Sequence, residues 1–275
     1  MRLSAALLSA LLPALAHAQP AAGLPAPSDG PRVSVTLQRA FFESEAAEIL
    51  LPLSLVAEVQ SGRVGPVQLQ AALPLAMLYT SVDAPRAEER YEATLGNLYL
   101  GLAGRVPAGP WVRVRLGAGV WAPLTELSGD ASDALTLLLA AAAAPDRPGG
   151  HLPGATTVVA HAEAEAGDPG RLVGRVRLAP QLVLQPAFDG PFSETATTLG
   201  VGYAVEGELP VGPVALALVV SGTTVSTFED DEPKTYLGFR LTGPAGPVEL
   251  GVSVRTPVVG LGPDAIGALG VSVPL

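Results

Sequence analysis

The chain has 275 residues, a formal net charge of −10 and no cysteine, and Lys234 is its only lysine. These features exclude a disulfide framework, a thiolate metal site and a cysteine nucleophile, and they argue against a nucleic-acid partner. Charged residues make up 15% of the sequence, whereas a typical soluble domain has about a quarter. No stretch of about 20 apolar residues follows residue 18, so no transmembrane helix is expected. The apolar side chains must therefore fill a large core or face lipid from alternate strand positions.

The first residues predict an export signal. Arg2 gives a short positive region, a Leu/Ala-rich run follows, and Ala16-His17-Ala18 forms an A-x-A cleavage site. The apolar run is too short to span a bilayer and is interrupted by Pro13, which favours a signal peptide over a membrane anchor. We expect a cleaved signal peptide over 1–18, a flexible Pro/Ala/Gly-rich leader over 19–31, and a β-barrel over 32–275.

From residue 32 onward, apolar and polar residues alternate with a period of two, which is typical of strands with one apolar face. Each segment is about 9–15 residues long, enough for a tilted strand to cross a bilayer and longer than most strands of soluble proteins. Twelve strands are predicted, near 33–38, 48–58, 67–79, 97–105, 111–121, 156–166, 171–185, 197–207, 213–222, 235–242, 247–256 and 266–275.

The connections between these strands alternate between short and long. Such an alternation is the layout of an outer-membrane barrel with both chain ends on the periplasmic side. The sequence therefore predicts an all-β fold: a closed, antiparallel, transmembrane up-and-down β-barrel of about 12 strands, or ten if a terminal segment does not pair. Short Pro/Gly turns lie at 64–67, 106–110, 166–170, 209–213 and 243–247, and longer loops lie at 40–46, 81–93, 123–155, 186–196, 223–234 and 257–265.

Two hairpins allow the strand register to be predicted. A turn over 243–246 places Arg240 opposite Glu249, and a turn around Asp168 places Glu163 opposite Arg175. The second turn also places His161 opposite Arg177. Opposite charges facing each other across paired strands stabilise a sheet and let ionised groups lie inside a narrow barrel.

The loop between the fifth and sixth strands departs from the period of two. Asp130 is a candidate N-cap for a short helix near 131–144, and Pro145 ends it. This helix is too short to span a bilayer. Three placements are open: inside the barrel mouth, on the outer lipid surface, or packed against neighbouring loops.

The stretch from Ala93 to Val106 contains the element Gly96-Asn97-Leu98-Tyr99-Leu100-Gly101-Leu102, followed by a Pro/Gly turn and a glycine-alternating strand. It resembles a segment common in uncharacterised bacterial outer-membrane β-barrels related to the aromatic-compound and fatty-acid channel group, with the pattern G-[DN]-x-x-[LV]-G-L. The resemblance implies an outer-membrane channel for small molecules, hydrophobic ones among them. The terminal aromatic residue typical of that group is replaced by Leu275, which supplies an apolar side chain.

Catalytic and metal-binding interpretations find little support in the sequence. A barrel phospholipase needs a serine beside a histidine on neighbouring strand positions. His151 lies in a Pro/Gly-rich loop, and Glu163 rather than a serine follows two residues after His161. The acidic run 229–232 fits a solvated loop or weak binding of a divalent cation. We expect no enzymatic activity, no cofactor and no resident metal.

Function is expected on the inward face of the barrel, because rings of charged side chains set selectivity in water-filled pores. The sequence predicts a passive channel for small solutes or small hydrophobic molecules in the outer membrane. The alternatives are a non-conducting structural or assembly barrel and a secreted soluble β-sandwich. The expected partners are outer-membrane lipids and the outer-membrane assembly machinery. The residues predicted to face the lumen are Arg105, Arg113, Arg115, Arg175, Arg177, Arg240, Arg255, Glu58, Glu163, Glu165, Glu206, Glu249 and His161.

Overall fold

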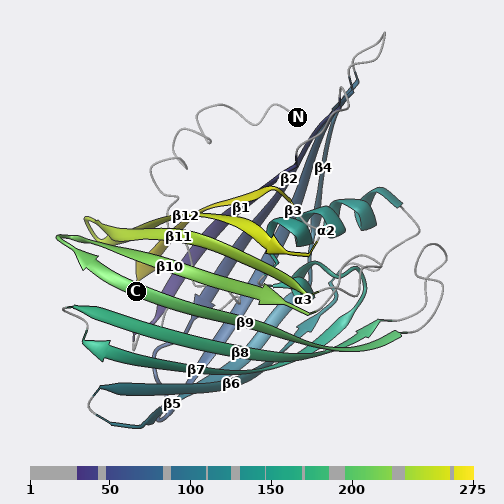
Figure 1. Ribbon diagram of the computed structural model, residues 1–275. Coiled ribbons are helices and arrows are strands. Elements are labelled where there is room, and N and C mark those ends of the chain that lie inside the picture. Colours follow the sequence, from purple (N-terminus) through teal and green to yellow (C-terminus); the bar gives the residue numbers. More distant parts are fainter. Residues whose placement is uncertain are drawn as a thin grey trace.

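The computed structural model describes residues 30–42, 48–82, 88–109, 111–124, 131–145, 147–168, 171–185, 196–224, 233–260 and 263–275. Within these residues, thirteen strands form one closed antiparallel sheet (Figure 1). The predicted all-β barrel is therefore confirmed, whereas the predicted signal peptide and most of the leader lie outside the described residues. The strands are β1 (Arg32–Phe41), β2 (Glu48–Gln60), β3 (Val67–Val82), β4 (Glu88–Leu95), β5 (Leu98–Pro107), β6 (Val112–Ala122), β7 (Thr156–Asp168), β8 (Leu172–Gln185), β9 (Ala196–Val211), β10 (Val214–Thr223), β11 (Lys234–Ala245), β12 (Val248–Val259) and β13 (Ala265–Pro274).

The sheet closes on itself because β1 pairs with β13 as well as with β2. Both β4 and β5 pair with β3, one after the other along its length. They occupy the place of a single strand, so the barrel has twelve strands around its circumference. Every other strand pairs with its neighbours in sequence, which is the predicted up-and-down order.

The two faces of the wall differ as the alternation predicts. Outward side chains are exposed, as Leu69 (56%) and Leu100 (56%) illustrate, whereas their neighbours Gln70 and Tyr99 are buried inside. Apolar side chains cover the outer face, which is how a barrel meets lipid hydrocarbon. No helix among the described residues is long and apolar enough to cross a membrane.

Three of the short turns share one geometry. Gly65, Gly212 and Gly246 each precede a proline and have φ angles of 65°, 62° and 67°. A positive φ at the first central position suits glycine and defines a type II′ hairpin turn. In the last of these turns Gly246 and Pro247 form the tip, so the predicted Arg240–Glu249 pair is wrong and Arg240 lies opposite Ser253.

The register of the β7–β8 hairpin is also shifted from the prediction. Gly167 and Asp168 stay paired within the strand instead of opening the turn. Consequently Glu163 lies opposite Arg177, and not opposite Arg175. His161 does not face Arg177 either. The shift is an even number of residues, so every side chain keeps its predicted face.

The hairpin of β3 and β4 extends further than predicted, since the expected loop over 81–93 contains the end of β3 and most of β4. Figure 1 shows β3 and β4 rising beyond most of the barrel rim. Among the described residues, this hairpin has a neighbouring strand on one side only, β2 beside β3, and the alternation of the sequence is weak there. Tyr79 and Tyr91 pair across this hairpin with ring centroids 4.7 Å apart.

A one-residue bulge separates β4 from β5. Leu75 pairs with Leu95, whereas Ala72 pairs with Tyr99, so Gly96 and Asn97 add one residue to this side of the ladder. Both residues are buried. A bulge re-aims side chains and interrupts the backbone ladder. Here it frees the backbone of Asn97 to bond to a segment inside the barrel.

Candidate functional site

The connection between β6 and β7 folds into the barrel. Its helices α2 (Ala131–Ala143) and α3 (Pro148–His151) lie near one rim in Figure 1. Leu137 and Ala140 of α2 form a buried cluster with Ala76, an inward-facing residue of β3. Thr136 Oγ1 donates a hydrogen bond of 3.0 Å to Glu92 of β4. The predicted helix is thus confirmed, and of its three possible placements the interior one is found. Its predicted N-cap, Asp130, lies outside the described residues.

Asn97 holds the segment around α3 in place. Its side-chain amide nitrogen lies 2.8 Å from the carbonyl oxygen of Gly149 and 2.9 Å from those of Leu152 and Ala155. Its backbone nitrogen donates to the carbonyl oxygen of Gly150 at 2.8 Å. The two amide hydrogens of this one inward-facing side chain are therefore shared among three backbone carbonyls of the same segment. We call residues 147–155 the plug segment.

Two further polar contacts join the plug segment to β2. Arg147 forms an ion pair with Glu58 at 2.5 Å, and both side chains are about 5% exposed or less. Ser34 of β1 donates to the other oxygen of Glu58 at 3.3 Å. Ser54 Oγ lies 2.8 Å from His151 Nε2, and neither residue has exposed surface. The predicted lumen residue Glu58 therefore anchors the plug segment.

The Ser54–His151 pair does not make a catalytic dyad. Both side chains are fully buried, and His151 Nδ1 has no hydrogen-bond partner that could orient the ring. His151 lies in α3, outside the strands. Burial, together with the nearby positive charge of Arg147, lowers the pKa of His151 to about 3. The imidazole is therefore neutral at neutral pH and serves as a hydrogen-bonding contact of the plug segment.

Aromatic side chains form the surface on which the plug segment lies. Tyr99 and Trp121 pack with ring centroids 4.9 Å apart. A Cβ on Gly149 would lie 2.8 Å from the Trp121 ring, so the plug backbone contacts the indole directly. Tyr99 lies flat over Gly119, where an added Cβ would be 2.5 Å from its ring. Gly149 and Gly119 have no side chains, and each therefore lets an aromatic ring pack directly against the backbone.

Gly96 provides a test of how closely the plug segment fits. A Cβ at this position would lie 2.2 Å from the carbonyl oxygen of Gly150. Overpacking of this kind costs about 1–3 kcal/mol, and each 1.4 kcal/mol changes an opening equilibrium about tenfold. We expect Gly96→Ala to make proteinase K cleavage within 140–155 about tenfold faster. Gly207→Ala is the control, because nothing lies within 4 Å of its Cβ position. Equal cleavage rates for the two variants would contradict the close fit.

A balanced charged network occupies the inner wall near the short turns. Arg175 donates to Glu165 at 2.9 Å, to Glu206 at 2.6 Å and to Glu208 at 2.8 Å. Arg240 bonds to Glu206 through both terminal nitrogens and to Glu208 at 2.9 Å. Several carboxylates thus share each guanidinium, which is how buried charges are retained without an unpaired member. Glu208 was not predicted, although it lies two residues from Glu206 on the same face.

A second charged row lies one level further into the barrel. Strand pairing places Arg105, Arg115, Glu163 and Arg177 side by side across β5 to β8. Arg177 bonds to Glu163 from two nitrogens, at 2.9 Å and 2.5 Å. His161 lies two residues before Glu163 on the same inward face and is 3% exposed. We call these five residues the arginine row.

The remaining predicted lumen residues also lie at inward-facing strand positions. Arg113 pairs with Glu165 at 3.0 Å, but its side chain is 57% exposed. Glu249 forms an ion pair of 3.3 Å with Arg32, which was not predicted. Arg255 is buried and lies 3.3 Å from Ser221 Oγ. The structure therefore brings most predicted residues into two clusters, and Glu58, Glu249 and Arg255 belong to neither.

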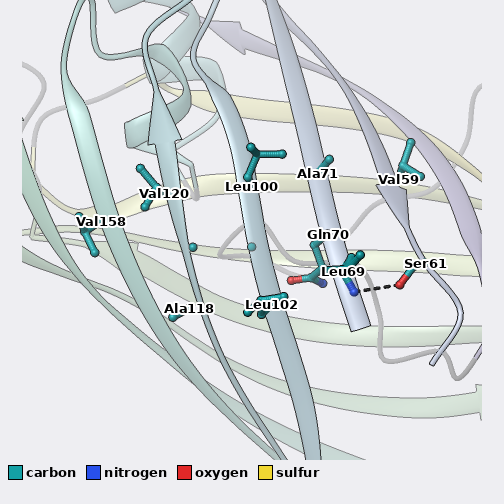
Figure 2. Close-up of a pocket in the computed structure, with 12 residues that line it drawn as sticks. Val59, Ser61, Leu69, Gln70, Ala71, Leu100, Leu102, Ala118, Val120 and Val158 are labelled. Atoms are coloured by element: carbon teal, nitrogen blue, oxygen red, sulfur yellow. Dashed lines mark hydrogen bonds between the residues drawn. The ribbon is translucent and has the colours of Figure 1, made fainter. Parts of the chain in front are cut away.

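An apolar groove of about 720 Å³ lies on the opposite side of the same wall. Figure 2 shows Leu100, Leu102 and Val120 along its strands. These side chains are 37–56% exposed and point outward. The small side chains of Ala71 and Ala118 between them leave the hollow. The groove lies on the outward face of the wall and does not belong to the polar interior.

No group of three or more metal-ligating side chains occurs within the described part of the chain. The acidic run 229–232 lies outside that part, so its suggested cation binding stays a prediction.

Comparisons with known proteins bear on the fold. No family model and no curated protein matches the chain. Among solved structures, the COG4313 outer membrane channel from Pseudomonas putida F1 is similar, with a TM-score of 0.64, 14% identity, and coverage of 91% of this chain and 97% of that one. The NanC porin has a TM-score of 0.52 at 8% identity, over 88% of this chain and all of that one. At such identities the likeness shows a shared fold, which is that of outer-membrane β-barrels.

Proposed function

We propose that the protein is a gated passive channel of the outer membrane for small solutes. The plug segment carries this proposal. In an eight-stranded barrel the interior is just wide enough for side chains to fill it. This barrel has twelve strands around its circumference, and α2 and the plug segment take up interior space. The plug segment and α2 therefore fill much of the lumen. Hydrogen bonds and an ion pair hold the plug segment in place, and water can replace such contacts.

The chemistry of the wall favours small polar solutes over hydrophobic ones. Arginine, glutamate, glutamine, serine and threonine side chains line most of the inward face, as Gln68, Thr36 and Ser272 illustrate. Inward-facing Gln70 has neither side-chain atom hydrogen-bonded within the protein. Buried polar atoms require partners, and water or a polar solute would provide them.

The proposal includes export to the outer membrane and insertion by its assembly machinery.

Planar-bilayer recordings test this function. The wild-type barrel is refolded and compared with a variant in which a short Gly/Ser linker joins Ala122 to Thr156; Trp121 and Thr157 already pair. We expect brief openings for the wild type and a larger, continuous conductance for the linker variant. Heat-modifiable migration on a gel confirms that both are folded. If neither protein conducts at any voltage, the channel is refuted and a structural barrel remains.

A further inference from the structure

We propose that protonation of His151 releases the plug segment, so that acid opens the channel. This inference rests on the proposed channel function and names how that channel is regulated. His151 and Arg147 are the titratable residues of the plug segment, and His151 has no exposed surface. Its imidazole contacts the barrel wall through Ser54 of β2, with 2.8 Å between Nε2 and Ser54 Oγ. A change in the charge of this ring therefore acts directly on a contact that holds the plug segment.

The surroundings of the ring accommodate only its neutral form. A neutral imidazole carries one N–H group and one bare nitrogen, whereas the imidazolium carries two N–H groups. In the charged form Nε2–H can donate to Ser54, but Nδ1 has no hydrogen-bond partner within the described part of the chain. Protonation in the closed barrel would therefore bury a charge and leave one N–H without an acceptor. Release of the segment into water removes both costs.

The charges around His151 also oppose its protonation. Arg147 lies close enough for its positive charge to disfavour the imidazolium. The elements packed against α3 are α2, β2 and β3. β3 has no charged residue, α2 has Asp133 in its first turn, and β2 has Glu48 and Glu58. Arg147 already binds Glu58 at 2.5 Å, so this carboxylate is engaged by a guanidinium and does not bond to the ring.

The difference in pKa between the two forms of the channel gives the direction and the size of the effect. Burial, together with Arg147, lowers the pKa of His151 to about 3 in the closed barrel, whereas a solvated imidazole has a pKa of about 6.5. The released form therefore binds the proton more tightly. The closed form keeps its full stability above about pH 6.5 and loses it as the pH falls towards 3. Between pH 7.5 and pH 5.5 the ratio of open to closed channels should rise about tenfold.

Proteolysis tests the switch without conduction. The rate of proteinase K cleavage within 140–155 is measured for the wild type and for His151→Gln at both pH values. Glutamine keeps a polar atom near Ser54 but does not titrate, and dividing the two rates cancels the pH dependence of the protease itself. We expect the wild-type rate relative to that of the variant to rise about tenfold on acidification. His151→Asn replaces His151→Gln if heat-modifiable migration shows that the glutamine variant does not refold.

His161→Asn is the matched control, because His161 lies on β7 in the arginine row and not on the plug segment. It should keep the full acid response. A rate ratio that is the same at both pH values would overturn the switch, and so would loss of the acid response in His161→Asn.

Single-channel recording separates the switch from the proposed channel function. The open probability of the wild type should rise about tenfold between pH 7.5 and pH 5.5, and the linker variant, which lacks His151, should not show this rise. A channel that conducts with the same open probability at both pH values would overturn the switch alone. Acid-dependent cleavage in a protein that never conducts would refute the channel and leave the release of the plug segment intact.

Discussion

Replacing Glu206 by glutamine should destabilise the barrel by about 3 kcal/mol, as expected when one partner of a buried ion pair is removed. Glu206 accepts hydrogen bonds from both Arg175 and Arg240, and it is 4% exposed. Without its charge, two guanidinium groups must share Glu208 and Glu165. The expected loss is at the lower end of the usual range because these two carboxylates remain. Urea unfolding in detergent micelles measures it.

The matched control for Glu206 is Arg113→Gln. Arg113 belongs to the same network through Glu165, but its side chain is 57% exposed. Exposed ion pairs contribute about 0–1 kcal/mol. We expect this variant to unfold within about 0.5 kcal/mol of the wild type. If Glu206→Gln is equally mild, the network is solvated and does not stabilise the barrel.

Asn97→Ala should raise the open probability of the channel about a hundredfold. The substitution leaves the carbonyl groups of Gly149, Leu152 and Ala155 without their side-chain donor. A buried group without its hydrogen bond costs about 1–3 kcal/mol, and water recovers part of this as the segment moves. A net shift of about 2.7 kcal/mol corresponds to the hundredfold change. Single-channel recording at a fixed voltage measures it.

Two comparison variants separate hydrogen bonding from size. Asn97→Asp keeps the shape of the side chain but replaces the donor with oxygens that face the three carbonyls. It should open the channel at least as much as Asn97→Ala. Gln70→Ala removes an inward-facing amide from β3 that has no bond to the plug segment, and its open probability should equal that of the wild type. Unchanged gating in both Asn97 variants would show that Asn97 does not hold the segment.

The inward face could be predicted from the sequence because the alternation of a strand is local. Arg115, Glu163 and Arg177 keep their predicted face whichever residue stands opposite. The opposite residue could not be fixed in the same way. It depends on which glycine adopts a positive φ, and the segment around Gly243 and Gly246 offers two candidates of which the structure uses the second.

The plug segment could not be predicted because its contacts are distant in sequence and have no period. Ser54 and His151 are 97 residues apart, and Asn97 reaches carbonyl groups more than 50 residues away. The resemblance over 93–106 did contain Gly96-Asn97. The sequence does not predict the bulge at these residues, because an isolated glycine in a strand pattern is equally compatible with a close approach of another backbone.

The pairing of β1 with β13 has a consequence for how the protein is made. Val33 pairs with Val273, so the barrel closes only when nearly the whole chain is available. Contacts this far apart in sequence slow folding. Until the final strand β13 arrives, the free edges of β1 and β12 present unpaired backbone groups that can join other chains. Deleting 265–275 should therefore leave an open, aggregating sheet instead of a smaller barrel, which pelleting after refolding in detergent would detect.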